Sequence, residues 1–159
     1  MKTYFMGVDP GATGAIAVID EDNNLIVAEH LAEDIPAIAN QFEAVLASCS
    51  GEVVFAVIEK VSAMPKQGVV SMFNFGMNFG SLQMALSCFL IPYELVTPQK
   101  WMKVAFDSGS GGKRIKTDKE ASLNLARRLY PKAILKFKKN HGIADAIHMA
   151  RYAKKNYEE

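Results

Sequence analysis

The segment Val53–Ile58 is an unbroken run of apolar and mostly β-branched residues, Val-Val-Phe-Ala-Val-Ile. A strand with one face in water alternates polar and apolar residues, so a run without alternation predicts a strand that is buried on both faces. Helices packed on both sides of a sheet bury a strand in this way. The run therefore predicts an α/β protein in which this strand lies in the interior of the sheet.

The other segments of the chain supply the rest of this sheet and its helices. Further strands are expected at Tyr4–Val8, Ala15–Ile19, Leu25–Ala28 and Tyr93–Val96. The three strands nearest the N-terminus follow one another so closely that they predict an antiparallel meander. Helices are expected over about 36–47, 69–89, from Pro98 onward, 117–130 and 142–155, with start signals at Asp34, Thr97 and Thr117–Glu120. With no linker and no internal repeat, the chain predicts one domain over 1–159, a mixed five-stranded sheet flanked by helices.

The most apolar segment, residues 69–91, contains no charged residue and is long enough to cross a bilayer. Ser71, Asn74, Asn78 and Ser81 nevertheless place a polar stripe along one face of this expected helix. We therefore expect a buried amphipathic helix and no membrane span.

Two features bear on where the protein works. Met1–Phe5 leads directly into the first expected strand, which leaves no room for a signal peptide. Cys49 and Cys88 have neither CxxC nor Cys/His spacing, so we expect buried, reduced thiols in a reducing compartment. The cytoplasm of a bacterium or of a phage-infected cell is the expected location, with an organelle as the alternative.

Three acidic residues stand in apolar surroundings. Asp9 follows the strand Tyr4–Val8, Glu59 follows the strand Val53–Ile58, and Asp145 lies within the apolar start of the last expected helix. A carboxylate in such a place is costly to bury unless it is paired or binds a metal ion. Cleavage of a phosphodiester by two divalent ions requires such converging carboxylates.

Each of these residues also has an ordinary structural explanation. Asp9 could form a turn with Pro10 and Gly11, Glu59 could pair with Lys60, and Asp145 could lie on a helix surface. Taken one at a time, these explanations are the better ones. Taken together they are less convincing, because two strand ends and one helix can share a single edge of a sheet.

Histidines add one candidate to this group. His141 lies four residues before Asp145, so both side chains can point the same way if the last helix already includes His141. A histidine there could bind metal or act on the attacking or leaving oxygen, whereas a helix cap or a surface residue is the ordinary alternative. His148, three residues after Asp145, could also reach this edge but is expected in the core or on the surface, and His30 is expected to be structural.

The net charge of +1 hides an uneven distribution. Residues 1–80 carry 3 Lys or Arg against 10 Asp or Glu, and residues 81–159 carry 15 against 7. The basic residues cluster in Lys113–Lys119 and Arg127–Lys139. Solvated helix faces would explain this, but a basic half beside an acidic site also suits a protein that holds a polyanion.

With these residues assembled, the chain resembles the RuvC-type Holliday-junction resolvases, most closely the phage and chloroplast branch. The resemblance rests on an ordered set of short motifs: Gly7–Gly11 with Gly14-Ala15, Ile58-Glu59-Lys60, Phe73–Gly80, Thr97–Trp101 and His141–Ala146. They cover nearly the whole chain. The resemblance implies an RNase H-like fold and a homodimer that cuts four-way DNA junctions by paired nicks.

The resemblance also implies a metal site and a dimer interface. Asp9, Glu59 and Asp145 would be the metal carboxylates, His141 would be the fourth residue of the site, and two Mg²⁺ or Mn²⁺ ions would bind there. The expected helix 69–89 would contribute to the dimer, where Gly76 and Gly80 would let another backbone approach. Phosphate contacts are expected from Lys100, Lys103, Lys113, Arg114, Lys116 and Lys119.

Two positions depart from the family pattern. His141 is four residues from Asp145, where bacterial members have a spacing of three, which leaves its role open. Bacterial members also carry a junction-stacking aromatic residue three positions after the strand-end glutamate, where this chain has Ser62. Either Phe73, Phe75 or a methionine takes over this stacking, or the stacking is absent.

Three other functions share some of these features. Actin-like ATPases and sugar kinases have a similar Asp-Pro-Gly-Ala-Thr-Gly loop, but they need a second nucleotide-binding half for which 159 residues leave no space. A ribonuclease H that acts on RNA·DNA hybrids is a second alternative. A non-catalytic junction-binding module is the third, and the complete acidic set argues against it.

Overall fold

The computed structural model describes residues 1–106, 119–133, 135 and 138–159. In these residues a five-stranded mixed sheet has the order β3-β2-β1-β4-β5. Strand β1 pairs antiparallel with β2 and β2 antiparallel with β3, whereas β1, β4 and β5 run parallel. The N-terminal meander and the interior position of the strand built from Val53–Ile58 are thereby confirmed.

The elements agree closely with the expected ones and are generally a little longer. The strands are β1 Thr3–Asp9, β2 Ala15–Asp20, β3 Leu25–His30, β4 Glu52–Glu59 and β5 Tyr93–Val96. The helices are α1 Ile35–Ala47, α2 Val69–Cys88, α3 Pro98–Phe106, α4 Lys119–Leu129 and α5 His141–Glu158, with a short 3-10 turn η1 at Lys138–Asn140. Asp34 caps α1 as predicted, because its Oδ1 accepts a hydrogen bond of 2.8 Å from the amide of Ala37. Thr117 and Asp118, which begin the expected capping box, lie outside the described residues.

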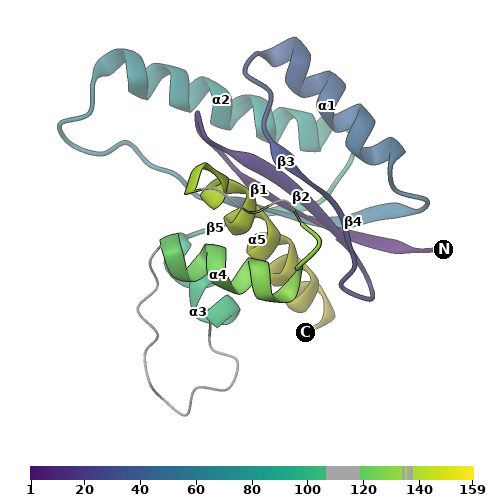
Figure 1. Ribbon diagram of the computed structural model, residues 1–159. Coiled ribbons are helices and arrows are strands. Elements are labelled where there is room, and N and C mark those ends of the chain that lie inside the picture. The colour runs from purple at the N-terminus through teal and green to yellow at the C-terminus, as the bar shows by residue number, and fades with distance from the viewer. Residues whose placement is uncertain (107–118, 134, 136–137) are drawn as a thin grey trace.

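Helices cover both faces of the sheet (Figure 1). On one face α1 and α2 pack against the side chains of Tyr4, Met6 and Val8. On the other face α3, α4 and α5 pack against Phe5 and the residues that alternate with it. Because strand residues alternate between faces, Asp9 is expected on the same side of β1 as Phe5 and Gly7, which is the side of α5.

Helix α5 lies directly on the backbone of β1. A Cβ atom added to Gly7 would be 2.1 Å from the carbonyl oxygen of Ala146 and 2.4 Å from the amide nitrogen of Ala150. No side chain fits between strand and helix at this point. The absence of a side chain at Gly7 therefore sets how close α5 comes to the middle of the sheet.

Helix α2 departs from its predicted burial. Only Leu82 and Leu86 of this helix are buried, and the N-terminal half carries exposed apolar side chains such as Phe73, which is 70% exposed. The sequence shows that this segment is apolar, but it does not show how much of the helix packs against the sheet of the same chain. Across the described residues, no helix combines the length and apolar character of a membrane span.

The prediction of buried thiols is also wrong. Cys88 is exposed at the last residue of α2, and Cys49 is half-buried. Burial raises the pKa of the Cys49 thiol above its usual value, so this cysteine is a weak nucleophile. Cys88 is exposed although Leu86 and Ile91 on either side of it are buried, so it lies on the side of α2 that faces away from the core.

The contact at Gly7 can be tested by substitution. Gly7→Ala should lower the free energy of unfolding by about 3 kcal/mol, the upper end of the range for overpacking, because backbone atoms surround the added methyl group. In the monomer Gly80→Ala is the matched control, since nothing in the described chain lies within 4 Å of its Cβ position, and a helical alanine should add up to about 1 kcal/mol. Urea denaturation measures both, and equal stability of the two variants would contradict the close contact.

Candidate active site

Two of the three predicted carboxylates end neighbouring parallel strands. Asp9 is the last residue of β1 and Glu59 is the last residue of β4. The residues before them, Val8 and Ile58, are partners in the β1–β4 register. Because the carboxyl ends of parallel strands meet at one edge of a sheet, Asp9 and Glu59 extend from the same edge.

Helix α5 brings Asp145 and His141 toward this edge. Its first turn packs on the loop after β1, since a Cβ atom at Gly142 would be 2.2 Å from the carbonyl oxygen of Thr13 and 3.4 Å from Oδ2 of Asp9. The negative charge of Asp145 is close enough to Glu59 to raise the pKa of its carboxyl. The helix therefore connects the two strand ends, with its start against Asp9 and Asp145 near Glu59.

His141 is the first residue of α5, so the condition for His141 and Asp145 to share a helix face is met. His141 is half-buried, and among the described residues its buried Nδ1 has no hydrogen-bond partner. An orphaned buried nitrogen is costly, which suits a group that meets a ligand or a metal ion when the site is loaded.

Burial raises the pKa of Glu59 above its usual value, the nearby charge of Asp145 adds to this, and a hydrogen bond from Trp101 opposes it. Nε1 of Trp101 donates this bond to Oε2 of Glu59 over 2.8 Å. Trp101 is in reach because β5 and β4 are in parallel register, with Val96 opposite Glu59, and α3 starts directly after β5.

Asp145 also has a donor from outside its own helix. Oγ of Ser122 in α4 donates a hydrogen bond of 2.5 Å to Oδ1 of Asp145. Ser122 is only 2% exposed, so its hydroxyl lies in the packed layer between α4 and α5. Asp145 is therefore a partly buried residue with a protein partner, and the explanation as a free surface residue of the helix does not hold.

His148 lies under both of these contacts. Its ring is fully buried, its Nε2 bonds to the backbone carbonyl oxygen of Ser122 over 2.9 Å, and it stacks on Trp101 with ring centroids 6.4 Å apart. Burial lowers the pKa of His148 to about 4, so the ring is neutral at pH 7 and Nε2 carries the proton that the carbonyl accepts. His148 was expected in the core or on the surface, and the structure places it in the core.

Trp101 and Ser122 were not predicted as parts of the site. Trp101 had two signals, because it ends the motif Thr97–Trp101 and is the single tryptophan of the chain. Ser122 had none, since a serine in a helix is most often on its surface. Both depend on packing between segments far apart in the sequence.

The donor set at this edge consists of carboxylate oxygens and one imidazole, which suits Mg²⁺ or Mn²⁺. Within the described ranges, however, no group of three or more His, Cys, Asp or Glu side chains is gathered as a ready metal site. The carboxylates fit the ions in kind and in location, and their side chains would have to move closer to hold one.

The loop after Asp9 is held from the other face of the sheet by α2. Oδ1 of Asn78 accepts a hydrogen bond of 3.1 Å from the amide of Gly11, and the ring of Phe75 lies over the same glycine. Phe75 therefore has a structural contact, whereas Phe73 projects into solvent at 70% exposure. Of these two candidates for a junction-stacking aromatic, Phe73 is the more accessible.

The predicted phosphate-binding residues are only partly described. Lys103 is exposed, but Nζ of Lys100 forms an ion pair of 2.8 Å with Glu94 and is therefore a weaker candidate. Lys119 starts α4, and Lys113, Arg114 and Lys116 lie outside the described residues.

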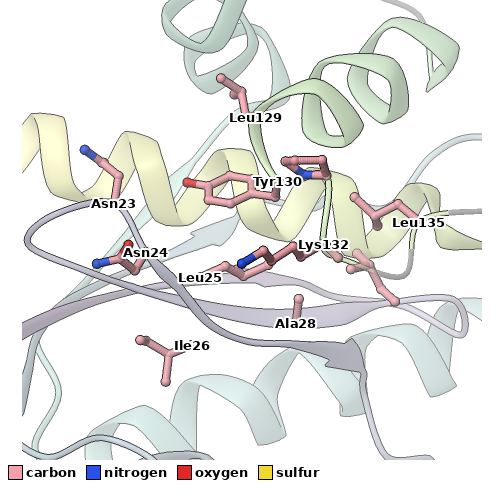
Figure 2. A pocket seen from close by; sticks show the side chains of 12 residues that line it. Asn23, Asn24, Leu25, Ile26, Ala28, Leu129, Tyr130, Lys132 and Leu135 are labelled. Carbon is pink, nitrogen blue, oxygen red and sulfur yellow. The ribbon is translucent and has the colours of Figure 1, made fainter.

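A cavity of about 540 Å³ lies elsewhere, between the β2–β3 hairpin and the segment after α4 (Figure 2). Leu25, Ala28, Tyr130 and Leu135 contribute to its lining, which includes none of the four candidate site residues. The cavity is therefore separate from the carboxylates at the sheet edge.

The buried His148 predicts a pH dependence of stability. The unfolded chain binds a proton near pH 6.5, whereas the folded chain does so only near pH 4, so stability falls as the pH drops through this window. The loss should total about 3 kcal/mol. Denaturation curves at several pH values should show that His148→Gln removes this part, while His30→Gln at an exposed position keeps it. An unchanged dependence in His148→Gln would contradict the assignment.

Comparisons with known proteins agree with this geometry at the level of the fold. The sequence matches no protein-family model and no curated protein. A solved structure of Thermus thermophilus RuvC in complex with a Holliday junction substrate has a TM-score of 0.62 at 16% identity, over 94% of this chain and 90% of that one. A second Thermus thermophilus RuvC structure has a TM-score of 0.60 at 17% identity, over 94% of this chain and 91% of that one. The chain therefore has the fold of the RuvC structures, the RNase H-like mixed sheet flanked by helices that the sequence predicted.

Proposed function

We propose that this protein is a structure-selective endodeoxyribonuclease that resolves four-way DNA junctions by paired, metal-dependent nicks. The observation that carries the proposal is the meeting of Asp9, Glu59 and the first turns of α5 at one edge of a RuvC-like sheet. One of the similar structures is a RuvC bound to a Holliday junction substrate, which supports branched DNA as the ligand.

In this proposal Asp9, Glu59, Asp145 and His141 hold two Mg²⁺ or Mn²⁺ ions. When bound, such ions activate a water molecule and stabilise the leaving 3′ oxygen of a phosphodiester. The residues of the chain supply the negative charge that attracts the ions and keep the carboxylates at a shared edge. The raised pKa of Glu59 means that metal and proton compete for this carboxylate, so activity should increase with pH in its acid range.

The basic second half of the chain would hold the DNA backbone. Lys103 on α3 is exposed, and Lys113, Arg114, Lys116 and Lys119 follow it in sequence. Contacts between basic side chains and phosphates are electrostatic, so DNA binding should weaken as the salt concentration rises. Because such contacts carry no sequence information, binding should depend mainly on the shape of the junction. Lys100 would contribute only if it left Glu94.

A second copy of the chain is proposed to cover α2. Val69, Val70, Phe73, Met77 and Met84 are all exposed apolar residues of this helix, between 48% and 85% exposed. Exposed apolar side chains in this number on one helix are typical of an interaction surface. A homodimer through α2 also supplies the two active sites that paired nicks require.

The decisive experiment is a nicking assay with Mg²⁺ on a four-way junction, a linear duplex and an RNA·DNA hybrid. We expect cleavage of the junction, and in Asp9→Asn or Glu59→Gln a loss of more than about 100-fold, because removal of even an outer-shell metal partner costs up to that amount. Junction binding, measured by gel shift, should persist or strengthen because negative charge near the phosphates is removed.

The matched control is Asp22→Asn, which neutralises an exposed aspartate in the β2–β3 turn. It should cleave like the wild type. Preferred cleavage of the hybrid would favour a ribonuclease H, and loss of binding together with cleavage in Asp9→Asn would count against the metal site. ATP binding would favour the kinase-like alternative and is not expected.

The dimer has its own test. Phe73→Asp places a charge on the exposed face of α2 and should convert dimers into monomers at micromolar concentration, as measured by sedimentation velocity. Ile35→Asp is the control, because Ile35 is 55% exposed and starts α1, where an acidic residue is well tolerated. A wild-type monomer, or equal loss of dimer in both variants, would refute this interface.

A further inference from the structure

We propose that Trp101 and Ser122 are positioning residues that orient Glu59 and Asp145 for metal binding, and that the buried ring of His148 joins them into one support. The proposal rests on the proposed metal-dependent function and assigns roles to three residues outside the carboxylate set. It concerns how the carboxylates are held, so it can be tested on the protein without DNA.

Trp101 is placed to fix Glu59. Its indole is fully buried and offers a single polar atom, Nε1, which donates to Oε2 of Glu59 over 2.8 Å. Because the indole is held by the packing of α3, its hydrogen bond holds Oε2 of Glu59 in place. This restricts the directions in which the second oxygen, Oε1, can point.

Ser122 has the corresponding role for Asp145. Its hydroxyl donates to Oδ1, and its position is itself held, because its own backbone carbonyl oxygen accepts the hydrogen bond from Nε2 of His148. Ser122 therefore has one contact toward the site and one toward the core. Removal of the hydroxyl alone would leave the contact with His148 in place.

His148 connects the two supports. Its ring stacks on Trp101 at an interplanar angle of 19° and lies against Phe106 with centroids 5.7 Å apart. The donor to Glu59 on α3 and the donor to Asp145 on α4 thus rest on one ring from α5. Hydrogen-bond partners behind metal ligands commonly contribute 10–100-fold in metal affinity or activity, about 1.4–2.7 kcal/mol.

The first experiment compares Trp101→Phe with Phe106→Leu. Trp101→Phe keeps an aromatic ring against His148 but loses the donor, whereas Phe106→Leu removes aromatic packing from the same ring and no donor to a carboxylate. Calorimetric titration of the DNA-free protein with Mn²⁺ should show affinity weakened by about 10–100-fold in Trp101→Phe only. Thermal unfolding should show that both variants are folded and that both lose stability.

The second experiment uses Ser122→Ala, a smaller change in a helix that favours alanine. It should also weaken Mn²⁺ binding by about 10–100-fold, and Ser122→Thr, which keeps a hydroxyl, should recover most of it. Ser81→Ala removes a helical hydroxyl that donates to the carbonyl oxygen of Met77 and should change nothing. In nicking assays the half-saturating Mg²⁺ concentration should rise, while the rate at saturating Mg²⁺ stays within about threefold.

Wild-type Mn²⁺ affinity in both Trp101→Phe and Ser122→Ala would overturn the proposal, as would equal weakening in Phe106→Leu. Absence of Mn²⁺ binding by the wild type would overturn it too. Wild-type protein that binds Mn²⁺ but does not cut junctions would refute the proposed function alone, and the titrations would still decide whether Trp101 and Ser122 position the carboxylates.

Discussion

The structure depends on the direct contact between the backbones of α5 and β1. Gly7 allows this contact in the middle of the strand, and Gly142 allows a second one where the helix starts against Thr13. Asp145 lies on α5 between Gly142, which contacts Thr13, and Ala146, which contacts Gly7. These two contacts together set the distance of Asp145 from the sheet. A bulkier residue at either glycine would move the helix carboxylate away from the strand ends.

The placement of the acidic residues costs stability. Glu59 is held in a setting that raises its pKa, and the donor from Trp101 offsets only part of the cost. His148 is buried in its neutral form, and neither its Nδ1 nor the buried Nδ1 of His141 has a hydrogen-bond partner in the part of the chain that the structure describes. Such losses of stability are typical of functional sites, where the polar groups are kept because they bind a ligand and not because they stabilise the fold.

The sheet and the placement of three acidic residues toward one of its edges could be predicted, because each leaves a local signal. The apolar run at Val53–Ile58 marks an interior strand, and acidic residues at the ends of apolar segments stand out one by one. The donors Trp101 and Ser122 could not be assigned, since their contacts join residues 42 and 23 positions apart. The exposure of α2 and Cys88 was not predicted, because composition shows that a segment is apolar but not which surface it packs against.

The hydrogen bond between Asn78 and Gly11 links α2 to the loop that follows Asp9. The same helix carries the exposed apolar residues, so the surface open to a partner and the clamp on the loop belong to one rigid element. A partner that shifts α2 would therefore change the energy of the loop, and by thermodynamic reciprocity a ligand that orders the loop would change the affinity for that partner by the same factor. Assembly and site occupancy in this fold would then be a single coupled equilibrium.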